Sequence, residues 1–229
     1  MVYPGGKNNV YHKIINLIPP HRVYIETHAG SAAIARYKRP AYQTVLIDRD
    51  PKVIKALSAG IANSGEVGLS GWSIVKSDAV AWLHRYQWRG DEFIYADPPY
   101  VMSARRQHRP IYRYEYTDRQ HKDLLDCLKS LPCMVMISGY WSQMYAAALE
   151  DWQVVTFEAI TRGGSVATEY LWMNYPEPTV LHDYNYLGDD FRERERIKRK
   201  ITRWVNRLES LPEVEKNAIL AALTGSYST

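Results

Sequence analysis

The sequence has no long apolar run and only two cysteines. No stretch approaches the roughly 18 consecutive apolar residues that cross a membrane, and the first residues lack the apolar segment of an export signal. We therefore expect a cytoplasmic protein without membrane association. Cys127 and Cys133 are too few for a disulfide framework, so both are expected to be reduced and buried. No metal site is predicted.

The sequence also has little net charge and little phenylalanine. The formal net charge is +4, but between Arg192 and Arg207 eight Lys/Arg stand against two Glu, so this segment is strongly basic. Phe occurs 3 times, whereas Tyr occurs 18 times and Trp 7 times. Tyr and Trp suit surfaces that are part apolar and part wet, including surfaces that stack on bases. The composition is compatible with a nucleic-acid partner without establishing one.

Strand-like and helix-like segments alternate along most of the chain. The 229 residues can form one sizeable α/β domain and a small appendage. Strands are predicted at 23–25, 45–47, 73–75, 93–96 and 134–138, and helices at 31–38, 51–63, 79–86, 118–128 and 142–149. This alternation predicts a parallel sheet covered on both faces.

The last two strand-like segments, 152–160 and 168–174, break this alternation. Only a short turn separates them, so they are expected to be antiparallel. A Rossmann-like, mostly parallel α/β sheet with a C-terminal antiparallel hairpin is the sheet of most S-adenosylmethionine (SAM) methyltransferases. We therefore predict such a domain over 1–180. Residues 181–229 are predicted to form a basic helical appendage, because apolar residues recur in it at helical spacing.

The most informative motif is Asp97-Pro98-Pro99-Tyr100, which follows the apolar strand 93–96. The two prolines forbid a helix, so a carboxylate, proline-flanked carbonyls and an aromatic ring are held at the carboxyl end of a strand. Open α/β sheets bind their ligands at this edge. The motif could grip a planar amine, with acceptors taking its N–H groups and Tyr100 stacking on the ring. The alternative is an ordinary turn.

Three further acidic residues are predicted to lie along the same edge. Glu26 opens a loop of small and polar residues that includes His28, Gly30 and Ser31, which is either a ligand loop or a tight strand–helix turn. Asp48 ends the second strand, where ribose hydroxyls are held in doubly wound folds. Asp78 could accept from an adenine amino group or cap the next helix. Together with Asp97 these carboxylates predict a binding cleft.

In order and spacing, these motifs resemble DNA adenine-N6 methyltransferases of the Dam type over most of the first 175 residues. The N-terminal segment Tyr3-Pro4-Gly5-Gly6-Lys7 is similar to the family's aromatic-x-Gly-Gly-Lys element. The resemblance implies SAM as cofactor and Asp97, Pro98, Pro99 and Tyr100 as catalytic residues. The implied cofactor-binding residues are Tyr3, Gly6, Lys7, Glu26, His28, Gly30, Ser31, Asp48, Asp78 and Asp97.

The chain departs from the Dam-type pattern in two ways. His28 and Ala32 replace an aromatic residue and a second glycine of the family's loop, and His28 is interpreted as a packing or hydrogen-bonding substitute. Only 48 residues separate Asp48 from Asp97, which leaves no room for the inserted target-recognition domain. The chain thus resembles a compact, phage-like member, of the kind associated with restriction-modification, in which sequence readout is reduced or relocated.

The loop 101–116 is the predicted substrate-binding segment. It carries Arg105, Arg106, Arg109 and Arg113 among tyrosines, a combination that suits phosphates and unstacked bases; an ordinary solvated loop is the alternative. The expected reaction transfers a methyl group from SAM to N6 of a flipped adenine in DNA. Three alternatives remain: RNA adenine methylation, protein glutamine-N5 methylation, and a non-enzymatic SAM- or nucleic-acid-binding module.

Overall fold

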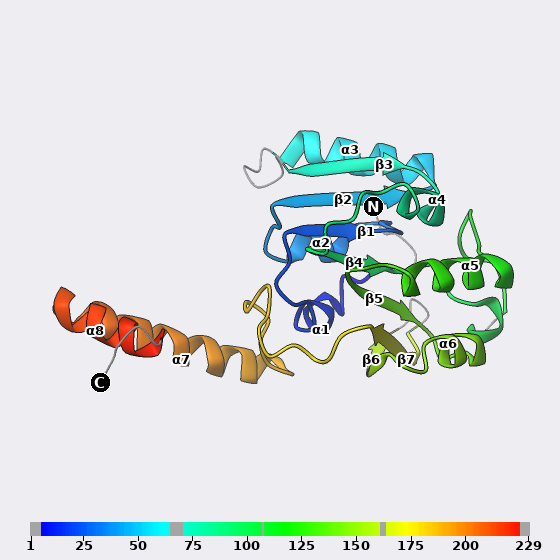
Figure 1. Ribbon diagram of the computed structural model, residues 1–229. Helices are drawn as coiled ribbons and strands as arrows, with labels where there is room; N and C mark the ends of the chain where they lie inside the picture. The colour runs from blue at the N-terminus through cyan, green and yellow to red at the C-terminus, as the bar shows by residue number, and fades with distance from the viewer. Residues whose placement is uncertain (1–5, 65–70, 107, 161–163, 225–229) are drawn as a thin grey trace. The chain divides into compact units, whose positions relative to one another are not determined.

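The structure is a computed structural model that describes residues 6–64, 71–106, 108–160 and 164–224. The chain divides into two compact units, Met1–Tyr184 and Asn185–Thr229 (Figure 1). We describe each unit by itself.

Within the described residues of the first unit, seven strands form one sheet in the order β3-β2-β1-β4-β5-β7-β6. The strands are β1 (Val23–Glu26), β2 (Gln43–Asp48), β3 (Trp72–Lys76), β4 (Glu92–Ala96), β5 (Met134–Gly139), β6 (Gln153–Ile160) and β7 (Val166–Met173). The first five strands are parallel, and β7 lies antiparallel between β5 and β6. The predicted fold, a mostly parallel sheet with a C-terminal antiparallel hairpin, is confirmed.

Burial of the strands follows from their sequences. Every residue of β1 and β4 is buried, as expected for central parallel strands covered on both faces. Residues of β6, the edge strand, are mostly exposed or half-buried. The chain runs outward from β1 to β3 and then returns to β4 on the other side of β1. This reversal leaves a crevice at the carboxyl ends of β1 and β4.

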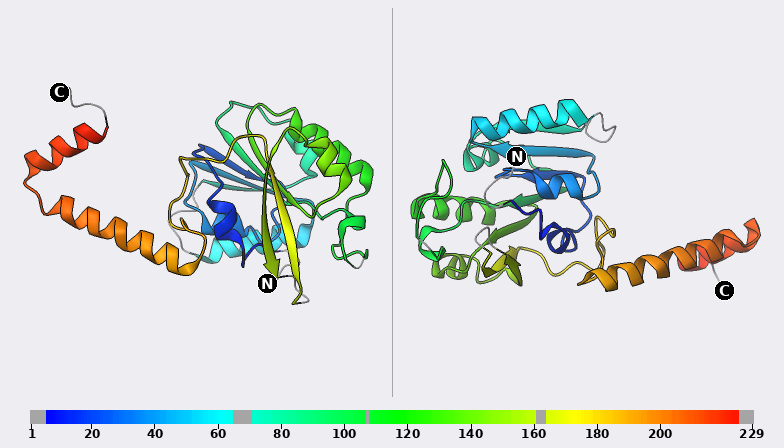
Figure 2. Two further views of the ribbon diagram at one scale, coloured as in Figure 1. Left: turned by 90° about the horizontal axis from the view of Figure 1, so that it is seen from below. Right: turned by 180° about the vertical axis from the view of Figure 1, so that it is seen from behind.

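Helices cover both faces of the sheet (Figure 2). On one face lie α1 (Tyr11–Ile15), α2 (Ala33–Tyr37) and α3 (Pro51–Ser64), and on the other lie α4 (Ala79–Leu83), α5 (Asp118–Lys129) and α6 (Gln143–Ala148). The N-terminus of α5 is fixed by a capping box. The Thr117 hydroxyl accepts from the backbone amide of Gln120, and the Gln120 side-chain oxygen accepts from the backbone amide of Thr117.

Three helices are shorter than predicted; α6 loses one residue at each end of the expected 142–149, and the other two differ more. The helix expected at 31–38 begins only at Ala33, because Ala32 takes a left-handed backbone conformation with φ of 51°. The helix expected at 79–86 ends at Leu83, where the amides of Arg85 and Tyr86 bond three residues back, to Trp82 and Leu83. Such tighter bonds replace the α-helical pattern in a final turn.

The segment after β7 is held on the first unit as far as Asp183. The His182 amide donates to the carbonyl oxygen of Ile18 (2.8 Å), and Asp183 accepts from the Arg39 amide (2.7 Å). The second unit contains α7 (Phe191–Glu209), capped by Asp190, and α8 (Glu213–Leu223), which follows Pro212. No helix among the described residues is long and apolar enough to span a bilayer.

Candidate active site

A cleft opens at the carboxyl edge of the sheet and encloses about 740 Å³, counting the space open to solvent. It contains eight of the ten residues predicted to bind the cofactor. These are Gly6, Lys7, Glu26, His28, Gly30, Ser31, Asp48 and Asp97. Tyr3 lies outside the described residues, and Asp78 is not among the residues that line the cleft. Three of the four carboxylates thus line the cleft, and Asp78 follows β3 at the same edge, between the cleft residues Ser77 and Ala79.

Asp97 follows β4 directly and is fixed through one of its two carboxylate oxygens. Its Oδ1 accepts a hydrogen bond from Lys7 Nζ (2.8 Å) and another from Ser138 Oγ (2.6 Å). Among the described residues, no donor lies within hydrogen-bonding distance of Oδ2. Asp97 lines the cleft with Pro99. The carboxylate is thus positioned through one oxygen and retains acceptor capacity on the other.

Lys7 connects Asp97 to Tyr100 and Glu169. Its Nζ donates to the Tyr100 hydroxyl (2.8 Å) and lies 3.7 Å from Glu169 Oε2, while the same hydroxyl donates to Glu169 (3.2 Å). Burial alone would lower the pKa of Lys7, but the carboxylates of Asp97 and Glu169 hold it well above its ordinary value. Lys7 is therefore a charged ammonium between two carboxylates.

Ser138 and Glu169 were not predicted as site residues. Ser138 lies near the end of β5 and Glu169 lies on β7, and both strands reach the site only because β5 pairs with β4 and β7 pairs with β5. The segments 137–140 and 168–172 do resemble later Dam-type segments, and this was the available signal. It did not say which side chains would touch Asp97.

Tyr100, the ring expected to stack on the substrate, is not among the aromatic residues that line the cleft. The Tyr100 ring packs edge-to-face on Tyr140, with ring centroids 4.6 Å apart, and its hydroxyl is held by Lys7. The tyrosines that line the cleft are Tyr112, Tyr114 and Tyr116. Burial raises the pKa of Tyr112 to about 12, with a further contribution from Asp97. Tyr112 is thus a neutral aromatic group in the electrostatic field of Asp97.

Asp48 ties the end of β2 to the loop that follows β1. Its Oδ2 accepts from the Gly30 amide (3.0 Å) and its Oδ1 from the Asp50 amide (2.8 Å). Gly30 has a φ of 49°, a left-handed conformation that glycine adopts without strain. Burial raises the pKa of Asp48. The Arg49 amide also donates to this carboxylate. Since a carboxylate can accept about four hydrogen bonds, Asp48 retains acceptor capacity for a ligand hydroxyl.

Glu26 is the most buried acid of the cleft. It accepts from the Tyr24 hydroxyl (2.9 Å) and from the Ala35 amide in α2 (3.3 Å). Burial raises its pKa to about 8, despite these two donors. Glu26 therefore carries a proton at neutral pH unless a cation binds beside it.

Asp78 and His28 both serve the local structure. The Asp78 carboxylate accepts from the Ala81 amide through Oδ1 (3.1 Å) and caps α4, so the capping role is confirmed, whereas its contact with the cofactor stays a prediction. The His28 ring nitrogens bond the Thr27 and Tyr116 hydroxyls, each at 2.9 Å. Burial lowers the pKa of His28 to about 3, so its ring is neutral.

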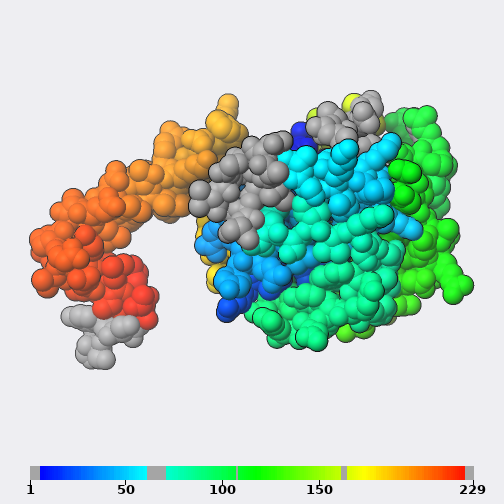
Figure 3. Space-filling view, turned by 90° about the horizontal axis from the view of Figure 1, so that it is seen from above, coloured from blue at the N-terminus to red at the C-terminus, as the bar shows by residue number. Residues whose placement is uncertain are grey.

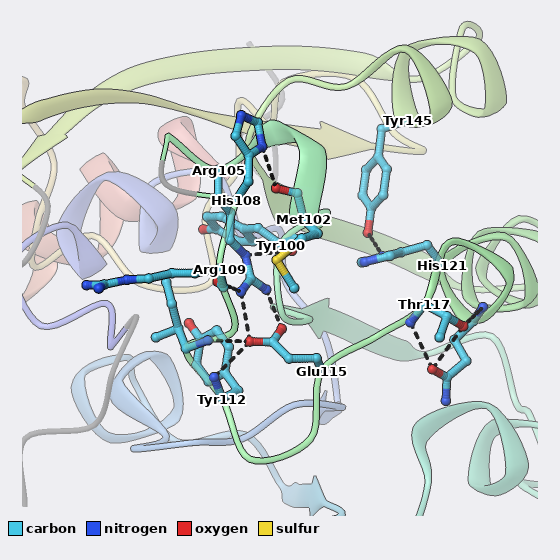
Figure 4. A network of polar contacts seen from close by, with 12 residues as sticks. Tyr100, Met102, Arg105, His108, Arg109, Tyr112, Glu115, Thr117, His121 and Tyr145 are labelled. Atoms are coloured by element: carbon cyan, nitrogen blue, oxygen red, sulfur yellow. Dashed lines mark hydrogen bonds and ion pairs between the residues drawn. The ribbon is translucent and has the colours of Figure 1, made fainter.

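The loop 101–116 is organised around a buried arginine (Figure 4). Arg105 is 5% exposed; it donates to the Tyr100 carbonyl oxygen (2.9 Å) and forms a two-bond pair with Glu115. Glu115 also accepts from the amides of Ile111 (2.6 Å) and Tyr112 (2.8 Å). The substrate contact expected for Arg105 is therefore a misassignment: its guanidinium is committed to the interior of the loop.

The three other arginines predicted to contact substrate are exposed. Arg109 extends away from the Arg105–Glu115 cluster in Figure 4. Arg113 lines the cleft, and its guanidinium lies 3.8 Å from Asp50. Arg106 is exposed at the start of the loop. Of these three arginines, Arg113 is therefore the one that lines the cleft.

The strand order, the reversal between β1 and β4 and the acidic cleft define the class: the first unit has the fold of the SAM-dependent methyltransferases. A family model described as Conserved hypothetical protein 95 matches residues 7–111, just under half of the chain. A search of curated protein sequences gives no match.

Solved structures with a similar fold are distant in sequence. The precorrin 8W decarboxylase of Methanobacterium thermoautotrophicum has a TM-score of 0.50 and 12% identity, covering 76% of this chain and 94% of that one. The protein PH0851 has a TM-score of 0.51 and 11% identity, covering 76% and 46%. An rRNA methylase from Streptococcus thermophilus has a TM-score of 0.48 and 9% identity, covering 76% and 97%. These likenesses concern the fold alone.

Proposed function

We propose that this chain is a SAM-dependent methyltransferase that methylates the exocyclic N6 of adenine in DNA. The observation that carries the proposal is the environment of Asp97. A carboxylate directly after β4, followed by two prolines, is held by Lys7 and Ser138 in a cleft at the switch point of the sheet. A restriction-modification or phage setting is not part of the proposal.

The residues of the cleft fit SAM. SAM carries an ammonium, a sulfonium and two ribose hydroxyls, and the cleft offers Glu26, Asp48 and Asp97 as acceptors. The left-handed turn at Gly30 lets a ligand approach the backbone closely. Asp48 would hold ribose hydroxyls on its remaining lone pairs, and Glu26 would bind the ammonium. When bound, SAM would supply a methyl group on a positively charged sulfur: the incoming nitrogen lone pair would form the N–C bond as the C–S bond breaks, the neutral thioether would leave, and the methylated nitrogen would lose one proton.

The chain's own chemistry is to make an aromatic amine nucleophilic. The lone pair of an adenine amino nitrogen is delocalised into the ring, so the nitrogen is a poor nucleophile. Asp97 and the carbonyl oxygen of Pro98 accept its two N–H hydrogens and draw the nitrogen out of conjugation. Lys7 and Ser138 keep the carboxylate in place, so that positioning supplies most of the catalysis.

The surroundings of the cleft suit a nucleic-acid base. A base must leave its stack to reach Asp97, and the tyrosines of the cleft offer aromatic faces to it. The exposed Arg106, Arg109 and Arg113 suit the flanking phosphates. The choice of DNA rests on the resemblance to the Dam-type motifs. RNA is the second candidate, because it offers the same amine and no described residue has been assigned to test for a 2′-hydroxyl.

Methyl transfer from labelled SAM to duplex DNA, single-stranded DNA, RNA and protein, measured in parallel, tests the proposal. We expect N6-methyladenine in DNA, identified after digestion to nucleosides. Asp97→Ala should abolish transfer and keep part of the SAM affinity measured by calorimetry, whereas Asp126→Ala, on the exposed face of α5, should keep full activity. Full activity of Asp97→Ala would refute the mechanism. Methylation of RNA or glutamine alone would reassign the substrate.

A further inference from the structure

Helix α7 carries a face made only of cations. Six basic residues fall on it at spacings of 4, 3, 1, 3 and 4: Arg192, Arg196, Arg199, Lys200, Arg203 and Arg207. At about 100° per residue they occupy an arc of roughly 100°. The helix has three acids, Glu193, Glu195 and Glu209, and none falls within this arc. We call these six residues the cationic face.

The cationic face is exposed and largely uncompensated. All six side chains are exposed, and α7 is drawn in orange in Figure 3. Arg196 pairs with Glu193 (3.2 Å). Within the described part of the chain, no carboxylate lies within ion-pair distance of the other five. Like charges at this spacing repel each other and disfavour the helix, so the face is suited to a polyanion.

We propose that the cationic face binds the phosphate backbone of the nucleic acid that the enzyme methylates; this rests on the proposed function. The face runs over 16 residues, from Arg192 to Arg207, or about 22 Å. Duplex DNA carries one negative charge per roughly 1.7 Å of axis, counting both strands, so a length of duplex equal to the face carries on the order of a dozen phosphates, of which those on one side can meet it. Backbone contacts supply affinity and position rather than sequence readout. Helix α7 thus supplies affinity to an enzyme that lacks an inserted recognition domain.

Two other occupants fit less well. A second copy would bring an equally basic helix, which the face would repel. An anionic lipid surface attracts basic amphipathic helices, and α7 has an apolar stripe that includes Ile197, Ile201, Trp204 and Leu208. However, the centre of that stripe lies about 120° around the helix axis from the centre of the cationic face. With the stripe buried in lipid, Lys200 and Arg207 could reach the headgroups, but Arg192, Arg199 and Arg203 would lie more than about 120° from the lipid-facing side. A phosphate backbone can instead meet the whole cationic face.

The test compares two double variants with the same change in charge. Lys200→Gln/Arg203→Gln removes one lysine and one arginine from the cationic face. Arg194→Gln/Lys198→Gln removes the same residue types from the side of α7 that carries the apolar stripe. Circular dichroism checks that both variants keep their helix content. Binding of a fluorescent 20-base-pair duplex is then followed by anisotropy between about 50 and 200 mM salt, the range over which phosphate contacts dominate.

We expect Lys200→Gln/Arg203→Gln, the pair on the cationic face, to make the negative slope of log K against log salt shallower by about 2, since each lost phosphate contact removes about 0.9 from it. The same pair should weaken binding by roughly tenfold or more. Arg194→Gln/Lys198→Gln, the pair outside the cationic face, should keep the wild-type slope. Equal effects of both pairs, or no effect of either, would overturn the assignment. So would preferential binding to phosphatidylserine vesicles that Ile201→Asn/Trp204→Asn abolishes while duplex binding is unchanged.

The duplex experiment can refute the role of α7 without refuting the proposed function, and the converse also holds. A wild-type enzyme that methylates DNA while both pairs bind duplex equally well would refute only the role of α7. A chain that methylates no nucleic acid, yet shows the face-specific change in slope, would refute only the methyltransferase assignment.

Discussion

The ammonium nitrogen of Lys7 lies 2.8 Å from Oδ1 of Asp97, although the two residues are 90 positions apart in the sequence. The same nitrogen bonds the Tyr100 hydroxyl, so one cation fixes both ends of the Asp97-Pro98-Pro99-Tyr100 motif. The Lys7 side chain is 5% exposed, and the Asp97 side chain is 16% exposed. Their ion pair is therefore shielded from water and depends on both partners being present.

Lys7→Met should destabilise the protein and inactivate it. Removing the ammonium leaves the carboxylates of Asp97 and Glu169 without their cation, which costs about 3 kcal/mol in the free energy of unfolding. Urea denaturation measures this loss. The double variant Lys7→Met/Asp97→Asn should be more stable than Lys7→Met, because it removes one unpaired charge. Equal stability of Lys7→Met and wild type would contradict the role of the pair.

Ser138→Ala should slow methyl transfer without weakening the binding of the cofactor. The hydroxyl makes the shortest hydrogen bond to Asp97, at 2.6 Å, and a hydrogen bond to a charged group contributes about 1.5 kcal/mol or more. We expect kcat to fall about tenfold, with an unchanged Kd for SAM. Ser73→Ala, at an exposed position of β3, is the control. A weaker SAM affinity with unchanged kcat would place Ser138 in cofactor binding instead.

Arg105→Lys should loosen the loop 101–116 although the charge is kept. Lysine cannot reproduce the two parallel bonds to Glu115, which in turn holds the amides of Ile111 and Tyr112. Hydrogen exchange should then accelerate at those two amides, and KM for the nucleic acid should rise. Arg106→Lys, an exposed change in the same loop, should leave the exchange rates unchanged. Unaltered protection in Arg105→Lys would show that the ion pair does not hold the loop.

The raised pKa of Glu26 should make the stability of the protein depend on pH. Burial raises its folded-state pKa from 4.5 to about 8. Between pH 5 and pH 7 the unfolded chain therefore loses a proton that the folded chain retains, and the free energy of unfolding falls, by about 2 kcal/mol from this group. Glu26→Gln should flatten this decline, measured as urea midpoints. An equally steep decline in Glu26→Gln would assign it to another group.

Glu26 also predicts a change in proton binding when the cofactor binds. Because the neutral form is favoured in the free protein, an ammonium beside Glu26 should release its proton. Calorimetry of SAM binding at pH 7 in two buffers of different ionisation enthalpy should detect about one proton released. No proton release would place the ammonium elsewhere in the cleft.

The sequence was most informative where one short segment carries the whole signal. Apolar runs bounded by turns located the strands, and the short link between 152–160 and 168–174 gave the antiparallel hairpin. Asp97-Pro98-Pro99-Tyr100 was placed at a strand end by its prolines alone. The start of α2 was missed because nothing in the sequence marks Ala32 as left-handed.

The errors lie where a role depends on a distant partner. A buried arginine and an exposed arginine look alike in a sequence, so Arg105 was grouped with Arg106 and Arg109 until the structure placed it against Glu115. Asp78 satisfied two patterns in the sequence, and the structure shows the local one, the cap of α4. Ser138 and Glu169 touch the Asp97–Lys7–Tyr100 cluster only because the sheet brings β5 and β7 to it.

The segment held on the first unit through His182 and Asp183 has a practical consequence for dissecting the gene. A fragment that ends at residue 180 would lack the hydrogen-bond partners of the Ile18 carbonyl and the Arg39 amide. It would also expose the ring of His21, which stacks on the ring of His182 with the centroids 3.9 Å apart. A stop codon after Tyr184 preserves all of these contacts. The truncated enzyme best suited to separate expression and crystallisation therefore ends there.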